Sequence, residues 1–205
     1  MRIRDLYDLT TTASWITEPK TDTQYAIEKI EDMLTIKFQG SVSKLDWFYN
    51  FLFLPLFLVK PYHHMPKLYF VHRGFLKKYK AVRTEIQKAV YENLEMKIRI
   101  LGYSQGAALA LLAHEDIRFT FGIQSETTVF GCPRVFSLFG YKMLNDRLSG
   151  VTRIENGNDI VTRLPFAILF FRHYGKRIHI GKKRNLFRFS TNDHLPHSYR
   201  ASVEE

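Results

Sequence analysis

Apolar and polar positions along this chain follow two alternating periods. Short runs rich in β-branched residues predict strands at 34–38, 96–101, 127–131 and 150–154. Apolar residues at helical spacing, or in an alanine- and leucine-rich run, predict helices at 23–33, 74–94 and 107–113. Strands that alternate with helices in this way predict an α/β fold, with a mostly parallel sheet covered by helices on both faces. The 205 residues fit one domain that spans residues 1–205.

The last third of the chain is rich in basic residues. Extended runs at 167–174 and 177–180 predict a hairpin that turns at Gly175-Lys176, and a short helix is expected at the carboxyl end. The formal net charge is +10, from 30 Lys and Arg against 20 Asp and Glu, and much of it falls within residues 175–188. This segment is either a solvated hairpin face or a surface that attracts an anionic partner. Because the sequence has no zinc-ligand spacing, RNP-like strand or basic heptads, nucleic acid ranks below an anionic membrane or lipid interface.

The most specific motif is Gly102-Tyr103-Ser104-Gln105-Gly106. It stands between a predicted strand and a predicted helix, which is the context of a nucleophile elbow. Glycine allows the cramped turn that presents the serine hydroxyl above the sheet, and the N–H groups that follow then point at an incoming carbonyl oxygen. An ordinary glycine turn is the alternative, but the context favours Ser104 as a catalytic nucleophile.

A serine nucleophile needs a base, and the base needs an acid that orients it. In this fold the order is serine, acid, histidine, and Asp159 follows the predicted strand at 150–154 at the right stage, although its Asn-Gly-Asn-Asp turn could also be simple turn chemistry. Histidines after Asp159 are His173, His179, His194 and His197. The first two fall in the predicted hairpin and are expected at the surface. Spacing alone does not choose between the other two.

Residues 47–59 form the most apolar stretch, with one polar side chain and a central Pro55. Thirteen residues are too few to span a bilayer. The stretch is either a buried core segment or a loop or short helix that opens onto lipid. Its place after the strand at 34–38 and a Gly-Ser turn favours the second interpretation, because α/β-hydrolases take an oxyanion donor from a loop after an early strand.

The single cysteine, Cys132, excludes an intramolecular disulfide and a cysteine-rich metal site. It fits a reducing compartment. The first residues lack the apolar stretch and small-residue cleavage site of a secretory signal. We therefore expect a cytoplasmic protein that binds peripherally to a membrane.

Six segments, in this order, resemble motifs of the class 3 lipases, the family that includes the fungal triacylglycerol lipases. They are Phe38-Gln39-Gly40-Ser41 with Asp46-Trp47, 71–75, 102–109, 130–135, 157–165, and Asp193-His194 with Tyr199. The resemblance covers about residues 34–199. It implies an α/β-hydrolase that cleaves ester bonds of lipids and uses neither a cofactor nor a metal.

Carried over position by position, the resemblance implies roles for five residues. Ser104 is the nucleophile, Asp159 the acid and His194 the base, which decides between His194 and His197. The backbone N–H groups of Ser41 and Gln105 form the oxyanion hole.

The resemblance also implies a lid that covers the serine and opens at a lipid–water interface. This lid begins at about Leu45, and its expected lipid-contacting residues are Trp47, Phe48, Phe51 and Phe53. Whether the substrate is an acylglycerol or a phospholipid does not follow from the sequence.

The elbow departs from the family pattern. Tyr103 and Gln105 replace the usual histidine and leucine, and Ala107 replaces a glycine. Gly-Tyr-Ser-Gln-Gly is also typical of cutinases, so a cutinase-like esterase is a rival. Cutinases are secreted and disulfide-stabilised and lack the motifs at 38–41 and 71–75, which favours the lipases. A catalytically inactive, membrane-binding relative and a nucleic-acid-binding protein are alternatives from other classes. Neither explains why serine, acid and histidine recur in the hydrolase order.

Overall fold

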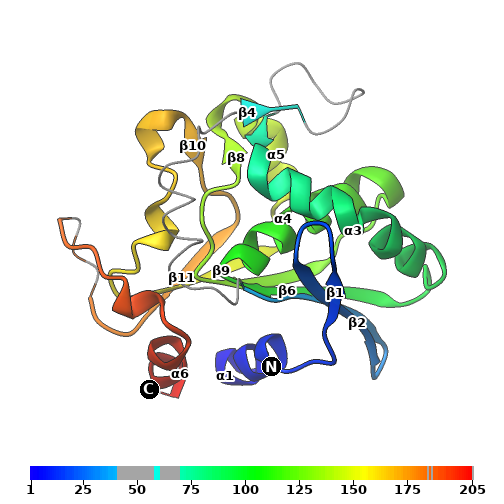
Figure 1. Cartoon of the computed structure of the whole chain (residues 1–205), viewed down its shortest axis with the longest axis horizontal. Coiled ribbons are helices and arrows are strands. Elements are labelled where there is room, and N and C mark those ends of the chain that lie inside the picture. Colours follow the sequence, from blue (N-terminus) through cyan, green and yellow to red (C-terminus); the bar gives the residue numbers. More distant parts are fainter. Residues whose placement is uncertain (41–57, 61–69, 184, 186, 205) are drawn as a thin grey trace.

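The computed structural model describes residues 1–40, 58–60, 70–183, 185 and 187–204. A seven-stranded sheet runs through its centre (Figure 1). In spatial order its strands are β1 (Ile16–Glu18), β2 (Thr23–Ile30), β3 (Met33–Phe38), β6 (Lys97–Tyr103), β7 (Glu126–Phe130), β9 (Val151–Asn156) and β11 (Lys176–Ile180). From β3 onward every neighbouring pair is parallel, whereas β1 and β2 are antiparallel additions at one edge.

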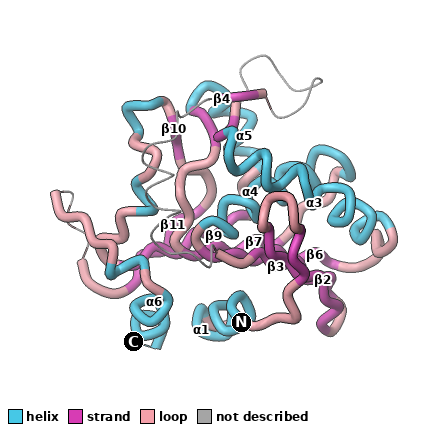
Figure 2. The backbone as a smooth tube through the Cα atoms, in the orientation of Figure 1, coloured by secondary structure: helices cyan, strands magenta, loops and turns pink. Residues whose placement is uncertain are grey.

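Helices cover both faces of this sheet, as Figure 1 and the tube of Figure 2 show. On one face α1 (Ile3–Thr11) packs beside α6 (Pro196–Glu204), so that both ends of the described chain lie together. On the other face lie α3 (Arg73–Tyr91) and α4 (Gln105–Phe121), with α5 (Tyr141–Arg147) beyond them. The predicted α/β architecture is therefore confirmed.

The helix that follows the elbow is buried over most of its length. Every residue of α4 from Gln105 to Ile117 is buried. The helix has no exposed face over this length because the sheet covers one side and α3 covers the other. In contrast, α3 buries one stripe at helical spacing: Phe75, Leu76, Tyr79, Val82, Ile86 and Val90. Each such side chain contributes roughly 1.5–3 kcal/mol when it leaves water, so this packing fixes the amino end of α4 against the sheet.

A second, antiparallel sheet of four short strands lies beside the first. Its strands, in spatial order, are β10 (Phe171–Arg172), β8 (Phe136–Ser137), β5 (Val71–His72) and β4 (Leu58–Val59). Single turns of 3₁₀ helix occur at η1 (Leu138–Gly140), η2 (Val161–Arg163), η3 (Ala167–Leu169) and η4 (Asn192–His194). Across the described part of the chain, each helix is too short or too polar to serve as a membrane span.

The prediction of a helix at 23–33 is wrong, because this segment forms β2 and the turn into β3. Residues 26, 27 and 30 imitate helical spacing, and Ala, Glu and Lys favour helices locally. In the fold, β2 pairs along its length with β3, from Tyr25 opposite Phe38 to Ile30 opposite Met33. A two-residue turn joins the strands, with Glu31 at a φ of 55°. Pairing of β2 with β1 on one edge and β3 on the other therefore overrides the local preference for a helix.

The predicted hairpin at 167–180 is also wrong. Residues 167–169 form η3, β10 joins the small sheet, and β11 pairs in parallel with β9. Gly175 has a φ of 79°, and a Cβ there would overlap Val151, so the chain crosses from one sheet to the other at a glycine.

Candidate active site

The elbow places Ser104 on a strained turn between β6 and α4. Its φ of 57° and ψ of −119° lie in a region that costs a non-glycine residue about 1–3 kcal/mol. The two flanking glycines are required by close packing. A Cβ at Gly102 would overlap the carbonyl of Gly106, and a Cβ at Gly106 would overlap the carbonyl of Phe38. The motif therefore lets α4 begin directly against β3 and β6, with the serine hydroxyl at the carboxyl end of the sheet.

Three predicted residues meet at this edge. The Oγ of Ser104 lies 2.8 Å from Nε2 of His194, and Nδ1 of His194 lies 2.9 Å from Oδ2 of Asp159. Asp159 is 1% exposed and Ser104 is 6% exposed, whereas the His194 side chain is 15% exposed. The serine hydroxyl is thus hydrogen-bonded to an imidazole, and the imidazole is hydrogen-bonded to a buried carboxylate. In such an arrangement the hydroxyl can become a nucleophile because the imidazole accepts its proton.

The carboxylate of Asp159 is held by two further donors. The backbone N–H of Val161 donates to Oδ1 at 2.8 Å, and the hydroxyl of Tyr199 donates to Oδ2 at 2.8 Å. Burial, together with the negative charge of Asp159, holds the pKa of Tyr199 well above its usual value, so this hydroxyl keeps its proton. The hydroxyl oxygen of Tyr199 also accepts a hydrogen bond from the backbone N–H of Asn156 at 3.1 Å.

The turn that carries His194 is fixed by backbone and side-chain hydrogen bonds. Asp193 accepts from the backbone N–H of Asn158 at 2.7 Å, and the side-chain amide of Asn156 donates to the carbonyl of Asp193 at 3.0 Å. Gly131, which follows β7, has a φ of 59°, and a Cβ there would stand 2.9 Å from Cε1 of His194. The imidazole is therefore packed against bare backbone.

Tyr103 lies against the imidazole rather than in solvent. Its hydroxyl donates to the carbonyl of His194, and the two rings stack with centroids 5.5 Å apart and an interplanar angle of 14°. Tyr7 of α1 contacts Tyr103 edge-on and donates its hydroxyl to the carbonyl of Pro196 at 2.8 Å. No local sequence pattern predicts this contact of Tyr7, because 189 residues separate it from Pro196.

The other three histidines considered from the sequence lie elsewhere. His197 is exposed on α6. Nε2 of His173 bonds to the carbonyl of Thr162 at 2.6 Å, so this half-buried ring supports the chain just after Asp159. His179 lies on β11, and its Nε2 bonds to the carbonyl of Lys182 at 2.9 Å.

Only part of the predicted oxyanion hole and lid falls within the described residues. Gln105 is the first residue of α4, and its backbone N–H therefore lies at the positive end of the helix. Gly40 approaches the serine so closely that a Cβ on it would stand 3.3 Å from Cβ of Ser104. Four expected lid residues (Trp47, Phe48, Phe51 and Phe53), together with Ser41, lie outside the described residues.

Two other buried histidines are structural. Burial lowers the pKa of both His72 and His114 to about 4, which keeps them neutral. Nδ1 of His72 caps the start of α3 by accepting from the N–H of Phe75, and His114 bonds to Thr127. Within the residues that the structure describes, no cluster of three or more His, Cys, Asp or Glu side chains could hold a metal ion.

Comparison with known proteins shows to which family the chain belongs. The family model for lipase (class 3) matches residues 35–169, more than half of the chain. The chain belongs to the class 3 lipase family. This class 3 lipase is 36% identical to the chloroplastic phospholipase A(1) DAD1 of Arabidopsis thaliana over 111 residues, which cover 48% of this chain and 25% of that protein. It is 31% identical to the secreted mono- and diacylglycerol lipase MDL3 of Malassezia globosa, over 68% of this chain and 49% of that protein.

A solved structure shares the fold of this class 3 lipase. That protein is a triacylglycerol lipase whose catalytic centre is formed by a serine protease triad. It superimposes with a TM-score of 0.76 at 23% identity, over 90% of this chain and 79% of that one. The predicted α/β-hydrolase fold is thus confirmed. In sequence, this class 3 lipase spans about half or less of the length of the two curated relatives.

Proposed function

We propose that this class 3 lipase hydrolyses carboxylic ester bonds of lipids through an acyl-enzyme on Ser104. One observation carries the proposal: a single line of hydrogen bonds runs from the Ser104 hydroxyl through both nitrogens of His194 to the buried Asp159. Family membership supports the same reaction class.

The mechanism follows from which atom each group faces. Nε2 of His194 removes the hydroxyl proton as Oγ of Ser104 attacks the ester carbonyl. Asp159 accepts from Nδ1–H, which fixes the tautomer and stabilises the imidazolium that forms. The imidazolium then gives its proton to the departing alkoxide. Water hydrolyses the acyl-enzyme along the same proton path in reverse.

The oxyanion that forms in each step needs hydrogen-bond donors. We assign one donor to the backbone N–H of Gln105 at the amino end of α4. The second is the N–H of Ser41, which follows Gly40 in the chain, and Gly40 closely approaches Ser104. By analogy with other oxyanion holes, each donor contributes about 3 kcal/mol to the transition state.

The substrate class is proposed from the relatives. One is named a phospholipase A(1) and another a mono- and diacylglycerol lipase. An acyl ester of glycerol is common to both names, so we propose a glycerolipid ester as the substrate.

We also propose that this class 3 lipase works at an anionic lipid interface. Large apolar side chains are exposed in and beside η3 and at residues 187–189; they include Phe166, Ile168, Phe170, Phe187 and Phe189. The net charge of +10 would draw such a surface toward anionic lipid. Because this attraction acts between exposed charges, binding to anionic vesicles should weaken as salt is raised.

Hydrolysis of p-nitrophenyl acyl esters tests the proposal. The Ser104→Ala variant should lose hydrolysis, while Ser149→Ala, an exposed serine before β9, should keep it. Circular dichroism checks that both variants fold. Full activity of folded Ser104→Ala would contradict the assignment. Mass spectrometry of products from a panel of acylglycerols and phospholipids then identifies the preferred lipid.

A further inference from the structure

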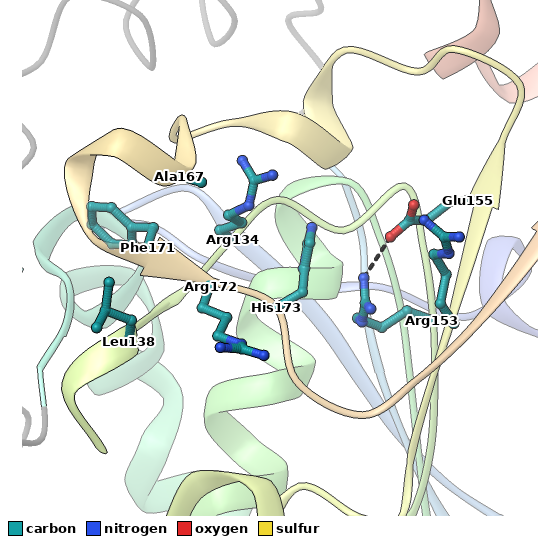
Figure 3. A pocket seen from close by; sticks show the side chains of 9 residues that line it. Arg134, Leu138, Arg153, Glu155, Ala167, Phe171, Arg172 and His173 are labelled. Carbon is teal, nitrogen blue, oxygen red and sulfur yellow. Dashed lines mark hydrogen bonds and ion pairs between the residues drawn. The ribbon is translucent and has the colours of Figure 1, made fainter. Parts of the chain in front are cut away.

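A pocket of about 490 Å³ lies beside β9 and β11, and none of the three proposed triad residues lines it. Figure 3 shows its side chains, which come from the strands of the central sheet and from segments 134–138 and 167–173. Four arginines line it: Arg134, Arg153, Arg172 and Arg177.

The pocket carries a large excess of positive charge. Among the lining residues that the structure describes, one carries a carboxylate: Glu155, which Arg153 binds at 2.5 Å (Figure 3). Four guanidinium groups against one carboxylate leave an excess of three positive charges, and a guanidinium does not deprotonate in proteins. Arg153 and Glu155 are only 6% and 3% exposed, so water screens this charge poorly on its inner side.

The register of the sheet forces two of these charges together. Arg153 of β9 stands directly opposite Arg177 of β11, so both side chains leave the same face. The pKa of Arg153 is lowered, mainly by burial and further by the charge of Arg177, whereas the charge of Glu155 raises it. The two guanidinium groups repel each other, and Glu155, which binds Arg153, supplies one negative charge for the pair. An anion in the pocket would supply a second.

Size and shape indicate what kind of anion fits. The volume is within the range of small-molecule sites, roughly 300–1,000 Å³, and far exceeds the roughly 30 Å³ of one water. Guanidinium groups match phosphate oxygens in a two-pronged geometry. Besides His173, the remaining lining residues are apolar: Leu138, Ala167 and Phe171. The adjoining η3 exposes 83% of Ile168. This combination suits a phosphate attached to an organic group.

We propose that this pocket binds the phosphate group of an organic phosphate, with Arg172 and Arg177 as the outer contacts and Arg153 at its inner wall. The phosphate belongs either to a lipid headgroup or to a soluble phosphomonoester. None of the residues that line the pocket has a role in the proposed ester hydrolysis. Phosphate binding can therefore be measured independently of hydrolytic activity.

Two double variants separate this site from a general attraction of anions. Arg172→Gln with Arg177→Gln removes two pocket charges, both on exposed residues. Lys176→Gln with Lys182→Gln removes the same charge from exposed neighbours that do not line the pocket, and Lys176 faces the opposite side of β11 from Arg177. Isothermal titration calorimetry of the whole chain with glycerol 3-phosphate and inorganic phosphate, at low salt, gives the affinities.

The proposal expects saturable one-to-one binding of glycerol 3-phosphate. The arginine pair should weaken it about tenfold or more, and the lysine pair by less than about twofold. Equal weakening by both pairs, unchanged binding in the arginine pair, or no binding of either phosphate probe to the folded protein would overturn it.

A vesicle experiment identifies the source of the phosphate. The Ser104→Ala chain is mixed with phosphatidylcholine vesicles that contain phosphatidic acid or phosphatidylglycerol at equal anionic content. Preference for phosphatidic acid that is lost in the arginine pair supports a lipid headgroup. Binding of glycerol 3-phosphate without that preference supports a soluble phosphomonoester.

Discussion

Tyr103 holds His194 from two sides: its hydroxyl donates to the histidine carbonyl, and its ring stacks on the imidazole at a centroid distance of 5.5 Å. Tyr103 stands one residue before Ser104, so the elbow that presents the nucleophile also positions the proposed base. In the sequence, Tyr103 is a departure from the family pattern, where a histidine is usual. Its contacts in the structure indicate that it is a positioning residue for His194.

Tyr103→Phe removes the hydrogen bond and keeps the stacking ring. We expect the kcat for p-nitrophenyl esters to fall severalfold with little change in KM, because the imidazole would sample more orientations while the substrate contacts remain. The matched control is Tyr91→Phe, which changes a tyrosine that is 69% exposed at the end of α3. A rise in KM at constant kcat would indicate that Tyr103 contacts substrate instead.

Asp116 ties the elbow helix to its neighbour through a buried cluster of bonds. Its carboxylate accepts from the hydroxyl of Tyr79 at 2.8 Å, from the guanidinium of Arg83 at 2.9–3.2 Å and from the amide of Gln87 at 3.0 Å. Asp116→Ala should lower the free energy of unfolding by about 3–5 kcal/mol, because it removes the buried carboxylate that pairs with partly buried Arg83.

Urea unfolding followed by circular dichroism measures this loss. Asp146→Ala, at an exposed position of α5, should change the unfolding free energy by no more than about 0.5 kcal/mol. A loss below about 1 kcal/mol for Asp116→Ala would mean that the cluster contributes little.

The elbow could be predicted because its requirements are local. Two glycines, a preceding strand and a following helix are all visible in sequence, and the structure shows both glycines in backbone contact that a Cβ would prevent. By contrast, the segment 23–33 was predicted as a helix, since its strand identity depends on pairing with β1 and β3. The chain between η3 and β11 was mistaken for a hairpin for the same reason: its partners are distant in sequence.

The proposed triad was likewise predictable only in part from local sequence. Residue order and turn chemistry singled out Ser104 and Asp159, but spacing left His194 and His197 equal, and only the family resemblance chose between them. The structure places His194 against Ser104 and leaves His197 exposed. The contact of Tyr7 with Pro196 joins opposite ends of the chain, and that of Asn156 with Asp193 joins residues 37 positions apart. No local sequence pattern predicts either contact.

His114 should make stability depend on pH. Burial lowers its folded pKa to about 4, below the 6.5 of an unfolded histidine. As pH falls from about 6.5 to 4, the unfolded chain binds a proton that the folded chain excludes, so the folded state loses up to about 3 kcal/mol through this group. His72 adds a loss of the same sign over the same range.

Urea midpoints measured between pH 7 and pH 4 test this dependence. His114→Gln should be less stable at pH 7 but should show a shallower decline than the unsubstituted chain. His197→Gln, at an exposed position, should keep the full slope. Identical slopes for all three proteins would rule out a contribution from His114.

Labelling with a fluorophosphonate probe tests the central claim most directly, because the probe reacts only with a serine whose hydroxyl is activated. Intact-mass and peptide mass spectrometry should find one adduct per chain, on Ser104, in the unsubstituted protein and in His197→Ala. Labelling should be lost in His194→Ala, which removes the imidazole 2.8 Å from the serine oxygen. An adduct on another residue, or labelling that persists in folded His194→Ala and disappears in His197→Ala, would contradict the account.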